Sequence, residues 1–412
     1  MRPLADAQRA VLEAMERLPA TSVPLEDCLG LVLAEDVVTS QAVPPFANSA
    51  MDGFAVRAAD VATVPVSLAV LEDVPAGSVA GSAVTPGTAI RIMTGAPIPE
   101  GADAVVIVED SESGEDGRVT LLAPAAVGDH VRRAGGDIEE GATVLPAGTR
   151  LNPMHLGLLA SIGDSEPEVV ERLTVAVLST GDELVSADAP ILRPGAIYDS
   201  NRPMLVAALA ELGVEVLDLG IIPDDARLLR AVLAEAASNA DAVLTSGGVS
   251  MGEYDLVKQV LIELGQVDFW RVAMQPAKPF AFGFLGETPF FGLPGNPVSV
   301  MVAYEQFVRP ALLLRMGATR LFRRRSAAVL STPIATNPQK TVFVRVRAEI
   351  GAEPMTVVPS GGQGSNVLTA LAFADAFAVV PVGVGDVAAG ATVELEWFRH
   401  PETRTYEEVF GG

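Results

Sequence analysis

The spacing of apolar residues changes along the first third of the chain. Between residues 4 and 18, apolar side chains recur at helical intervals, which predicts an amphipathic helix. Residues 41–130 instead carry short runs typical of β-strands, at 64–71, 89–93 and 104–108, and Gly/Pro turns separate them. Short strands between turns of this kind indicate a small β-rich domain.

From residue 174 to residue 314 the pattern alternates between buried-strand runs and helices. Strands are predicted at 174–178, 214–219 and 242–245, and helices at 202–212, 225–237, 255–264 and 297–314. Such alternation with short loops predicts a mostly parallel sheet with helices on both faces. Further strand-like runs predict a β domain at the C-terminus, at 341–350, 376–381 and 392–397.

Composition narrows the class of protein. The 412 residues are 49% hydrophobic but only 5% aromatic, which indicates globular domains with aliphatic cores. No uninterrupted apolar run of about 18 residues occurs, and the first 20 residues lack the features of a secretory signal. We therefore expect a cytoplasmic protein without a membrane span.

Charge and the scarcity of cysteine and histidine argue against several kinds of site. The net charge of −24, from 28 basic and 52 acidic residues, disfavours nucleic acid and anionic lipid as partners. Cys28 is the single cysteine, so no intramolecular disulfide can form. His130, His155 and His400 lie far apart in the sequence, which argues against a zinc site or a His-dependent catalytic triad. An anionic substrate would need a divalent metal or a local basic pocket.

Three loops of the predicted α/β domain suit a phosphate-bearing ligand. They are Ser179-Thr180-Gly181-Asp182-Glu183, Ser246-Gly247-Gly248-Val249-Ser250 and Gly292-Leu293-Pro294-Gly295-Asn296. Ligands bind beyond the carboxyl ends of parallel strands, where glycines let backbone N–H groups approach an anion. Asn296 followed by Pro297 favours a helix start, and a helix N-terminus also suits an oxyanion. Each loop alone could be an ordinary turn, but the three together favour a phosphate site.

Charged side chains near these loops are candidates for a metal site and an anion site. Carboxylates occur at strand or helix ends of this domain at Asp182, Glu183, Asp224, Asp225 and Asp255. Most carboxylates of so acidic a chain are solvated, but several beside a phosphate-binding loop are suited to Mg²⁺. Lys278 lies between prolines and is a candidate partner for an anion, the alternative being a turn lysine in water.

A set of short strings extends over nearly the whole chain. The strings are PPFANSAMDGFAV, RIMTGAPIPEGADAVV, AGGDI, STGDEL, IYDSN, LGIIPDD, SGGVSMGEYD, FWRVAMQPAKPFAFG, GLPGNPVS and GSNVLTAL. No single string is decisive, but the ordered set resembles the molybdopterin molybdenumtransferase family. Its bacterial members are called MoeA, and the family also includes the E domain of gephyrin.

The resemblance implies a multidomain fold of α/β plus β type. Its parts are an elongated discontinuous N-terminal domain (1–40 plus 133–170), an inserted β-rich domain (41–132), a molybdopterin-binding three-layer α/β/α domain (171–319) and a C-terminal β domain (320–412). It also implies a homodimer with the active site between subunits. The implied reaction is Mg²⁺-dependent insertion of molybdate into adenylyl-molybdopterin with release of AMP. Transient contacts with molybdopterin adenylyltransferase and apo-molybdoenzymes would follow.

The resemblance also implies roles for particular residues. The implied catalytic positions are Asp52, Thr94, Asp137, Glu183, Asp224, Asp255, Arg271, Lys278 and Ser365. Molybdopterin or its phosphate would contact Ser179, Thr180, Gly181, Ser246, Gly247, Gly248, Ser250, Pro294 and Asn296. Molybdate would lie near Gln275, Lys278, Ser299, Arg345 and Ser365, and the metal ligands would be Asp224 and Asp255.

The chain departs from the commonest family pattern at four of these motif positions. Gln275 and Ala277 stand where Lys and Gly are frequent, Ala47 replaces an Asp, and Phe54 replaces a Tyr. Gln275 therefore removes one positive charge beside the implied oxyanion site.

Two other functions stay open on the sequence alone. Molybdopterin adenylyltransferase resembles the α/β domain alone, so the first 170 residues argue against it. A gephyrin-like scaffold that anchors partners without turnover is disfavoured because nothing in the chain resembles a partner-anchoring linker. Tungstate is similar to molybdate in size and charge, so these residues do not distinguish the two oxyanions.

Overall fold

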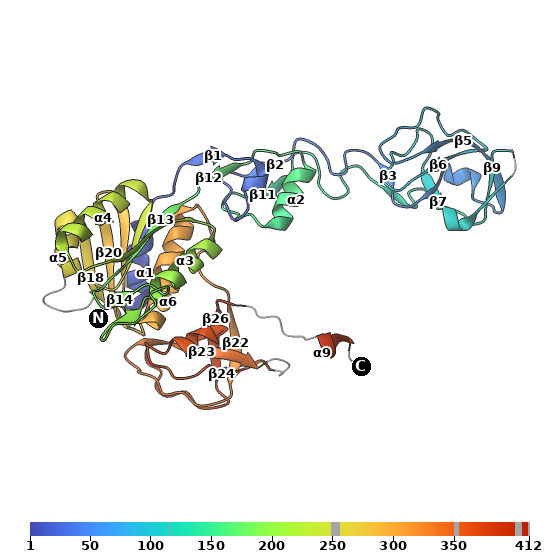
Figure 1. Ribbon diagram of the computed structural model, residues 1–412. Coiled ribbons are helices and arrows are strands. Elements are labelled where there is room, and N and C mark those ends of the chain that lie inside the picture. Colours follow the sequence, from blue (N-terminus) through green and yellow to red (C-terminus); the bar gives the residue numbers. More distant parts are fainter. Residues whose placement is uncertain (115, 249–255, 350–353, 400–405, 411–412) are drawn as a thin grey trace.

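The computed structural model describes residues 1–114, 116–248, 256–349, 354–399 and 406–410. The molecule is elongated, with a small β domain at one end of a thin arm (Figure 1). An α/β domain and a C-terminal β domain lie together at the other end. Among the described residues, no helix has both the length and the apolar character needed to cross a bilayer.

A six-stranded sheet in the order β16-β13-β17-β21-β20-β18 forms the centre of the α/β domain. The bounds are β13 (Thr174–Thr180), β16 (Glu215–Ile222), β17 (Ala242–Ser246), β18 (Gly265–Arg271), β20 (Pro279–Leu285) and β21 (Thr288–Leu293). β16, β13, β17 and β21 are parallel and β20 and β18 are antiparallel, so the sheet is mostly parallel, as predicted. The sequence did not predict β18, β20 or β21, because glycines and prolines interrupt the apolar run from residue 265 to residue 293.

Helices cover both faces of this sheet. The first face carries α1 (Leu4–Glu13), α3 (Asn201–Leu212) and a continuous segment of α6 (Pro297–Ala303), η4 (Tyr304–Val308) and α7 (Arg309–Arg315). The second face carries α4 (Ala226–Asn239) and α5 (Leu256–Leu264). The predicted helices are therefore present, with η4 as a π-helical turn inside the last of them.

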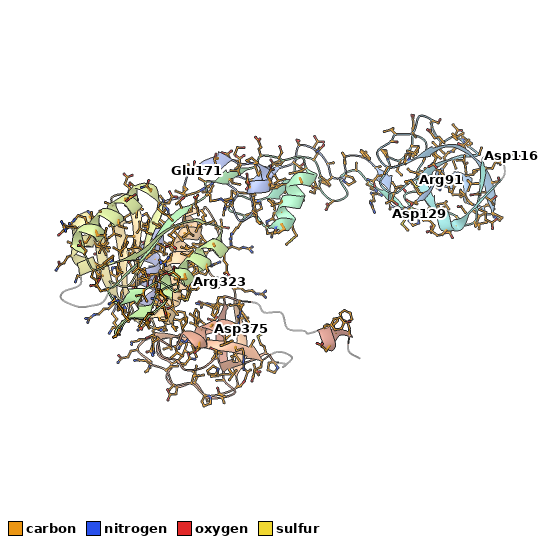
Figure 2. The ribbon with its side chains drawn as sticks, viewed as in Figure 1. Arg91, Asp116, Asp129, Glu171, Arg323 and Asp375 are labelled. Carbon is orange, nitrogen blue, oxygen red and sulfur yellow. The ribbon has the colours of Figure 1, made fainter. Side chains whose placement is uncertain are left out.

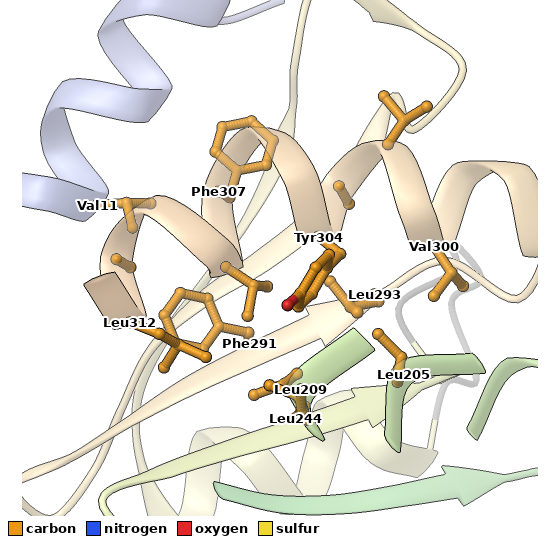
Figure 3. Packing of buried hydrophobic residues seen from close by; sticks show 14 of the residues in the cluster. Val11, Leu205, Leu209, Leu244, Phe291, Leu293, Val300, Tyr304, Phe307 and Leu312 are labelled. Carbon is orange, nitrogen blue, oxygen red and sulfur yellow. The ribbon is translucent and has the colours of Figure 1, made fainter. Parts of the chain in front are cut away.

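Helix α1 differs from its prediction in length and in position. It ends at Glu13 instead of residue 18, and Leu18 donates its N–H to the carbonyl of Arg315 at 2.9 Å. Figure 3 shows Val11 beside the helix that carries Phe307 and Leu312. Ala7 and Val11 pack α1 on the α/β domain, although the helix lies within the range 1–40 predicted for the elongated domain.

The arm consists of two chain segments paired side by side. The pairs are β1 (Ala20–Ser22) with β12 (Glu168–Val170), β2 (Val37–Val38) with β11 (Thr143–Leu145), and β3 (Asn48–Ser49) with β10 (Val131–Arg132). Helix α2 (Pro153–Ser161) and the short η1 (Leu25–Asp27) pack beside them. A small aliphatic core that includes buried Cys28, Leu33 and Leu159 holds the arm together.

The distal β domain holds a six-stranded sheet in the order β7-β4-β6-β5-β9-β8. Its elements are β4 (Gly53–Val56), η2 (Ala58–Asp60), β5 (Val66–Val74), β6 (Thr88–Ile92), β7 (Ala104–Ile107), η3 (Val108–Asp110), β8 (Ser111–Ser113) and β9 (Arg118–Leu121). The predicted runs at 64–71, 89–93 and 104–108 thus correspond to β5, β6 and β7.

The C-terminal domain is a closed barrel, because β23 pairs with both β24 and β25. Its elements are β22 (Arg325–Leu330), β23 (Thr341–Glu349), β24 (Thr356–Pro359), α8 (Leu368–Ala372), β25 (Ala376–Val380) and β26 (Thr392–Trp397). Outside the barrel lie α9 (Tyr406–Phe410), β14 (Leu184–Val185), β15 (Ile197–Tyr198) and β19 (Met274–Gln275), the last paired with β23. The predicted fold class, multidomain α/β plus β, is confirmed.

Candidate active site

The carboxyl ends of β13, β17 and β21 feed loops that surround a cavity of about 300 Å³. The predicted site residues that line this cavity are Thr180, Glu183, Ser246, Gly247 and Asn296. Asn366 and Leu368 of the C-terminal domain also line it. Two domains of the chain therefore form one cavity, at the sheet edge where the sequence predicted a ligand site.

Gly247 brings two of these loops into close contact. Its φ of +89° lies in the left-handed region, and a Cβ atom there would lie only 2.7 Å from the backbone oxygen of Thr180. Its N–H donates to the carbonyl of Leu293 at 3.1 Å, which connects the loop after β17 to the end of β21. Only glycine tolerates this conformation and this approach together.

The motif IYDSN, residues 197–201, supplied none of the predicted site residues, but all five of its residues line the cavity. Asp199 is 4% exposed and accepts hydrogen bonds from Ser179 Oγ at 3.2 Å and from Arg202 Nε at 3.1 Å. Asn201 donates its Nδ2 to the carbonyl of Gly295 at 2.7 Å. Asp199 and Asn201 line the cavity. The sequence signal that could have identified Asp199 and Asn201 was a charged residue and an amide directly before the helix predicted at 202–212.

Ser365 of the C-terminal domain occupies the start of α6. Asn296 occupies the predicted N-cap position and Pro297 follows it in the first turn, but the Asn296 side chain makes no capping hydrogen bond to the helix backbone. Instead, its Nδ2 donates to Ser365 Oγ at 3.0 Å, and the N–H of Val298 donates to the Ser365 carbonyl at 3.1 Å. Part of the helix N-terminus predicted to bind an oxyanion is thus already satisfied by the protein.

Arg345 supports the loop that carries Ser365. Its side chain is 1% exposed, and Nη2 donates to the carbonyls of Gly362 at 3.0 Å and Gly364 at 3.1 Å. Burial lowers the pKa of this guanidinium to about 10. Arg345, buried Ser299 and buried Pro294 do not line the cavity, so the structure places these predicted contacts behind its wall.

Three carboxylates lie close together beside the cavity. The N–H of Asp224 donates to Asp182 Oδ1 at 3.1 Å. Partial burial, followed by the neighbouring charges of Asp182 and Glu183, raises the pKa of the Asp224 carboxyl above its usual range. In the described part of the chain, no group of at least three His, Cys, Asp or Glu residues has the arrangement of a metal site. Asp255 and Ser250, also predicted here, lie outside the described residues.

Arg271, Gln275 and Lys278 lie at the end of the β18–β20 hairpin and are exposed. The hairpin also reaches the barrel, because β19 pairs with β23 through Met274 and Gln275. None of the three side chains lines the cavity. They form an exposed polar and cationic group at the junction of the α/β domain and the barrel.

Asp52 and Thr94 form a separate pair in the distal domain. The N–H and the hydroxyl of Thr94 both donate to Asp52 Oδ1 at 2.7 Å. These bonds, the one from the hydroxyl first, lower the pKa of the exposed Asp52 carboxyl. Exposed Asp137 lies in the arm, where its N–H donates to the Val43 carbonyl at 3.0 Å. Within one chain, the distal domain lies far from the α/β cavity (Figure 1).

Sequence profiles of three regions match the chain in succession. They are described as the MoeA N-terminal region (domain I and II), a probable molybdopterin binding domain, and the MoeA C-terminal region (domain IV), and they match residues 2–163, 176–314 and 327–398. Molybdopterin molybdenumtransferase 2 of Mycobacterium tuberculosis is 41% identical, over 96% of this chain and 99% of that protein. The chain belongs to the MoeA family.

Other relatives agree with this assignment. The molybdopterin molybdenumtransferase of Haemophilus influenzae is 40% identical over 94% of this chain and 96% of that protein. The crystal structure of a molybdopterin biosynthesis moeA protein from Pyrococcus horikoshii superposes with a TM-score of 0.82 at 29% identity, covering 97% of this chain and all of that one. In MoeA terms, Asp52 and Thr94 fall in the N-terminal region, whereas the cavity loops fall in the molybdopterin binding domain.

Proposed function

We propose that this MoeA-family chain inserts molybdenum from molybdate into adenylyl-molybdopterin, releasing AMP and leaving molybdenum cofactor. Family membership makes it a transferase of molybdenum cofactor biosynthesis. The observation that carries the finer proposal is the cavity beyond β13, β17 and β21, lined by hydroxyls and bordered by carboxylates. Strand-end loops of this kind are where an open α/β sheet binds a phosphate-bearing ligand.

The cavity residues supply binding and positioning rather than a nucleophile. Thr180 and Ser246 offer hydroxyl donors to a phosphate group, and Asn201 Oδ1 is buried without a partner among the described atoms. Cleavage of a phosphoanhydride depends mainly on positioning and on stabilising charge, which such groups provide. The sulfurs that capture molybdenum belong to the pterin, so the protein needs no cysteine or histidine cluster.

The carboxylates beside the cavity fit Mg²⁺ bound together with the substrate. Mg²⁺ usually takes one or two carboxylates and completes its shell with substrate phosphates and water. Asp224 would be one such ligand, because the raised pKa of its carboxyl reflects burial and the uncompensated charge of Asp182 and Glu183. Asp255 would be the other. When bound, the cation would neutralise charge on the phosphate groups.

We also propose that the active site is completed by a second copy of the chain. Asp52 and Thr94 lie at the far end of the arm from the cavity, so one chain does not bring them to its own α/β loops (Figure 1). A two-fold dimer could bring the distal domain of each chain to the cavity of the other. Lys278 and Gln275 would then face molybdate at the junction with the barrel.

The direct test is AMP release from adenylyl-molybdopterin by the purified chain. We expect release to require both molybdate and Mg²⁺, because charge stabilisation beside the carboxylates depends on the cation. Chromatographic quantification of AMP, with and without molybdate and with excess chelator, provides the measurement. Equal release in chelator would reject the magnesium role. Release without molybdate would show that hydrolysis is not coupled to metal insertion.

A further inference from the structure

A second cavity, of about 250 Å³, lies at the corner where α3, the η4–α7 helix and the C-terminal domain meet. Its lining contains four arginines, Arg150, Arg309, Arg323 and Arg399, but only two carboxylates, Glu211 and Glu305. Figure 2 shows Arg323 at the junction of the α/β domain with the C-terminal domain. In a chain of net charge −24, such a local excess of cations is unusual.

Two of the four arginines already have carboxylate partners. Arg323 binds Glu305 through two hydrogen bonds, of 2.9 Å from Nε and 2.8 Å from Nη2. Arg399 pairs with Asp375 at 3.0 Å. Glu305 and Asp375 are nearly fully buried, so each is committed to its own arginine. Both pairs are internal to the protein. The other two guanidiniums, of Arg150 and Arg309, have no carboxylate partner among the described residues.

Arg150 and Arg309 form no ion pair with any described residue within 4 Å. Arg150 donates only to backbone carbonyls, the closest being that of Leu212 at 2.7 Å. Arg309 has a single long hydrogen bond, to the Leu321 carbonyl at 3.3 Å. Both are half-buried, and burial, with the charge of Arg323, lowers the pKa of both guanidiniums. The charge of Glu305 offsets part of this desolvation cost at Arg309, but neither arginine has a carboxylate at ion-pair distance among the described residues.

These two arginines also separate the corner cavity from a neighbouring one. A cavity of about 510 Å³ on the arm side is lined by Arg150, Arg309, Arg320 and Thr319. The two guanidiniums are therefore accessible from both sides and have free N–H donors to offer. A planar guanidinium binds the oxygens of a tetrahedral anion through charge-assisted hydrogen bonds.

We propose that Arg150 and Arg309 form a second anion site, which binds a free tetrahedral dianion of the phosphate, sulfate or molybdate class. The site lies where the arm, the α/β domain and the barrel meet, apart from the candidate active site. A bound dianion pairs with two guanidiniums that form no ion pair with a described residue, and it links the arm to α7. This inference does not depend on the proposed reaction, because it rests on charges that the catalytic loops do not use.

The test is a titration of the full-length chain with inorganic phosphate at constant ionic strength, followed by calorimetry and by the thermal midpoint. We expect saturable phosphate binding at the corner of each chain, separate from any binding at the loops of the candidate active site, and a midpoint that rises with phosphate but not with chloride. Arg309→Gln should weaken this binding by about tenfold or more, because it removes a charge-assisted donor. Arg309→Lys keeps the charge without the planar donor pair and should retain weaker binding, which covers the case in which the glutamine variant fails to fold.

Two control variants separate this site from others. Arg227→Gln removes an exposed arginine on α4 and should leave phosphate binding unchanged. Asn296→Ala alters the candidate active site and should also leave the corner site intact. Phosphate binding that is unchanged in both Arg309 variants, or that is lost entirely in Asn296→Ala, would overturn the proposal. A wild-type chain that binds no phosphate would also overturn it. If Arg309→Gln then weakened self-association, the group that occupies the corner would be a carboxylate of a second copy instead of a free anion.

Discussion

Asp224 and Asp225 are neighbours whose carboxyl pKa values shift in opposite directions. Burial and the charges of Asp182 and Glu183 raise the pKa of Asp224 above its ordinary value of 3.8. The Asp225 carboxylate caps α4, accepting from Leu228 N–H at 3.0 Å and Arg227 N–H at 2.8 Å, and these bonds lower its pKa. At neutral pH the charged form of Asp224 is therefore unfavourable in the folded state, whereas that of Asp225 is favourable.

We expect Asp224→Ala to raise the thermal midpoint at pH 7 in magnesium-free buffer and Asp225→Ala to lower it. The sign follows from linkage: the penalty at Asp224 appears as the pH rises through its raised pKa, and the benefit at Asp225 disappears as the pH falls through its lowered one. The difference at Asp224 should fade as the pH falls from its raised pKa to about 4, the ordinary pKa of aspartate, whereas the difference at Asp225 should shrink only below about pH 4. Calorimetric scans at pH 7 and in acid measure this. Shifts of the same sign would contradict the assigned environments.

Gln275 supports a second prediction at this scale. Its exposed side chain lies on the hairpin that carries Lys278, at the junction with the barrel. If this face binds molybdate, Gln275→Lys adds a positive charge and should lower the molybdate concentration needed for half-maximal AMP release. The gain should be largest at low ionic strength, where screening is weakest. Gln275→Met is the matched neutral control, and an identical molybdate dependence at every salt concentration would show that the side chain points away from the anion.

At the scale of elements, the barrel positions Ser365 through one buried arginine on β23. Arg345→Met keeps the side-chain volume but leaves the carbonyls of Gly362 and Gly364 without their donor. We expect a loss of about 1–3 kcal/mol in the free energy of unfolding, the usual consequence of unpairing buried polar groups. Hydrogen exchange should also accelerate in residues 361–366. Arg347→Met changes an exposed residue of the same strand and should do neither; equal effects of the two variants would reject the role of Arg345.

The sequence predicted elements well wherever one periodicity dominated. The parallel strands β13, β16 and β17 and the helices α3 and α4 follow their apolar patterns to within a few residues. The hairpin of β18 and β20 was missed, because Gly283 and the prolines around Lys278 break the strand pattern. The prediction that Asn296 caps the last helix was also wrong in part, because Asn296 occupies the N-cap position but its side chain makes no capping hydrogen bond. A local sequence rule cannot anticipate that Ser365, 69 residues away, binds the Asn296 side chain.

At the scale of the whole molecule, the sequence predicted that three loops lie at one edge of the sheet, but not how their residues combine. Thr180, Ser246, Gly247 and Asn296 meet at one cavity because parallel strands end at the same sheet edge. Arg345 is buried, and the Ser179 hydroxyl donates to Asp199 instead of facing the cavity. Both features depend on long-range packing, so the motifs could not reveal that these two residues do not line the cavity. Asp52 and Thr94 lie at the other end of the elongated chain (Figure 1).

That separation makes the shared active site testable by complementation. Asp52→Ala damages the distal domain and Asp224→Ala the cavity, so each homodimer should be nearly inactive. Refolding the two variants together in equal amounts makes roughly half of the dimers mixed, and each mixed dimer holds one intact and one doubly damaged site. Activity should then return to about a quarter of wild type. Differently tagged chains recovered together confirm exchange. If exchange occurs and no activity returns, both residues act within one chain's own site or Asp52 has another role.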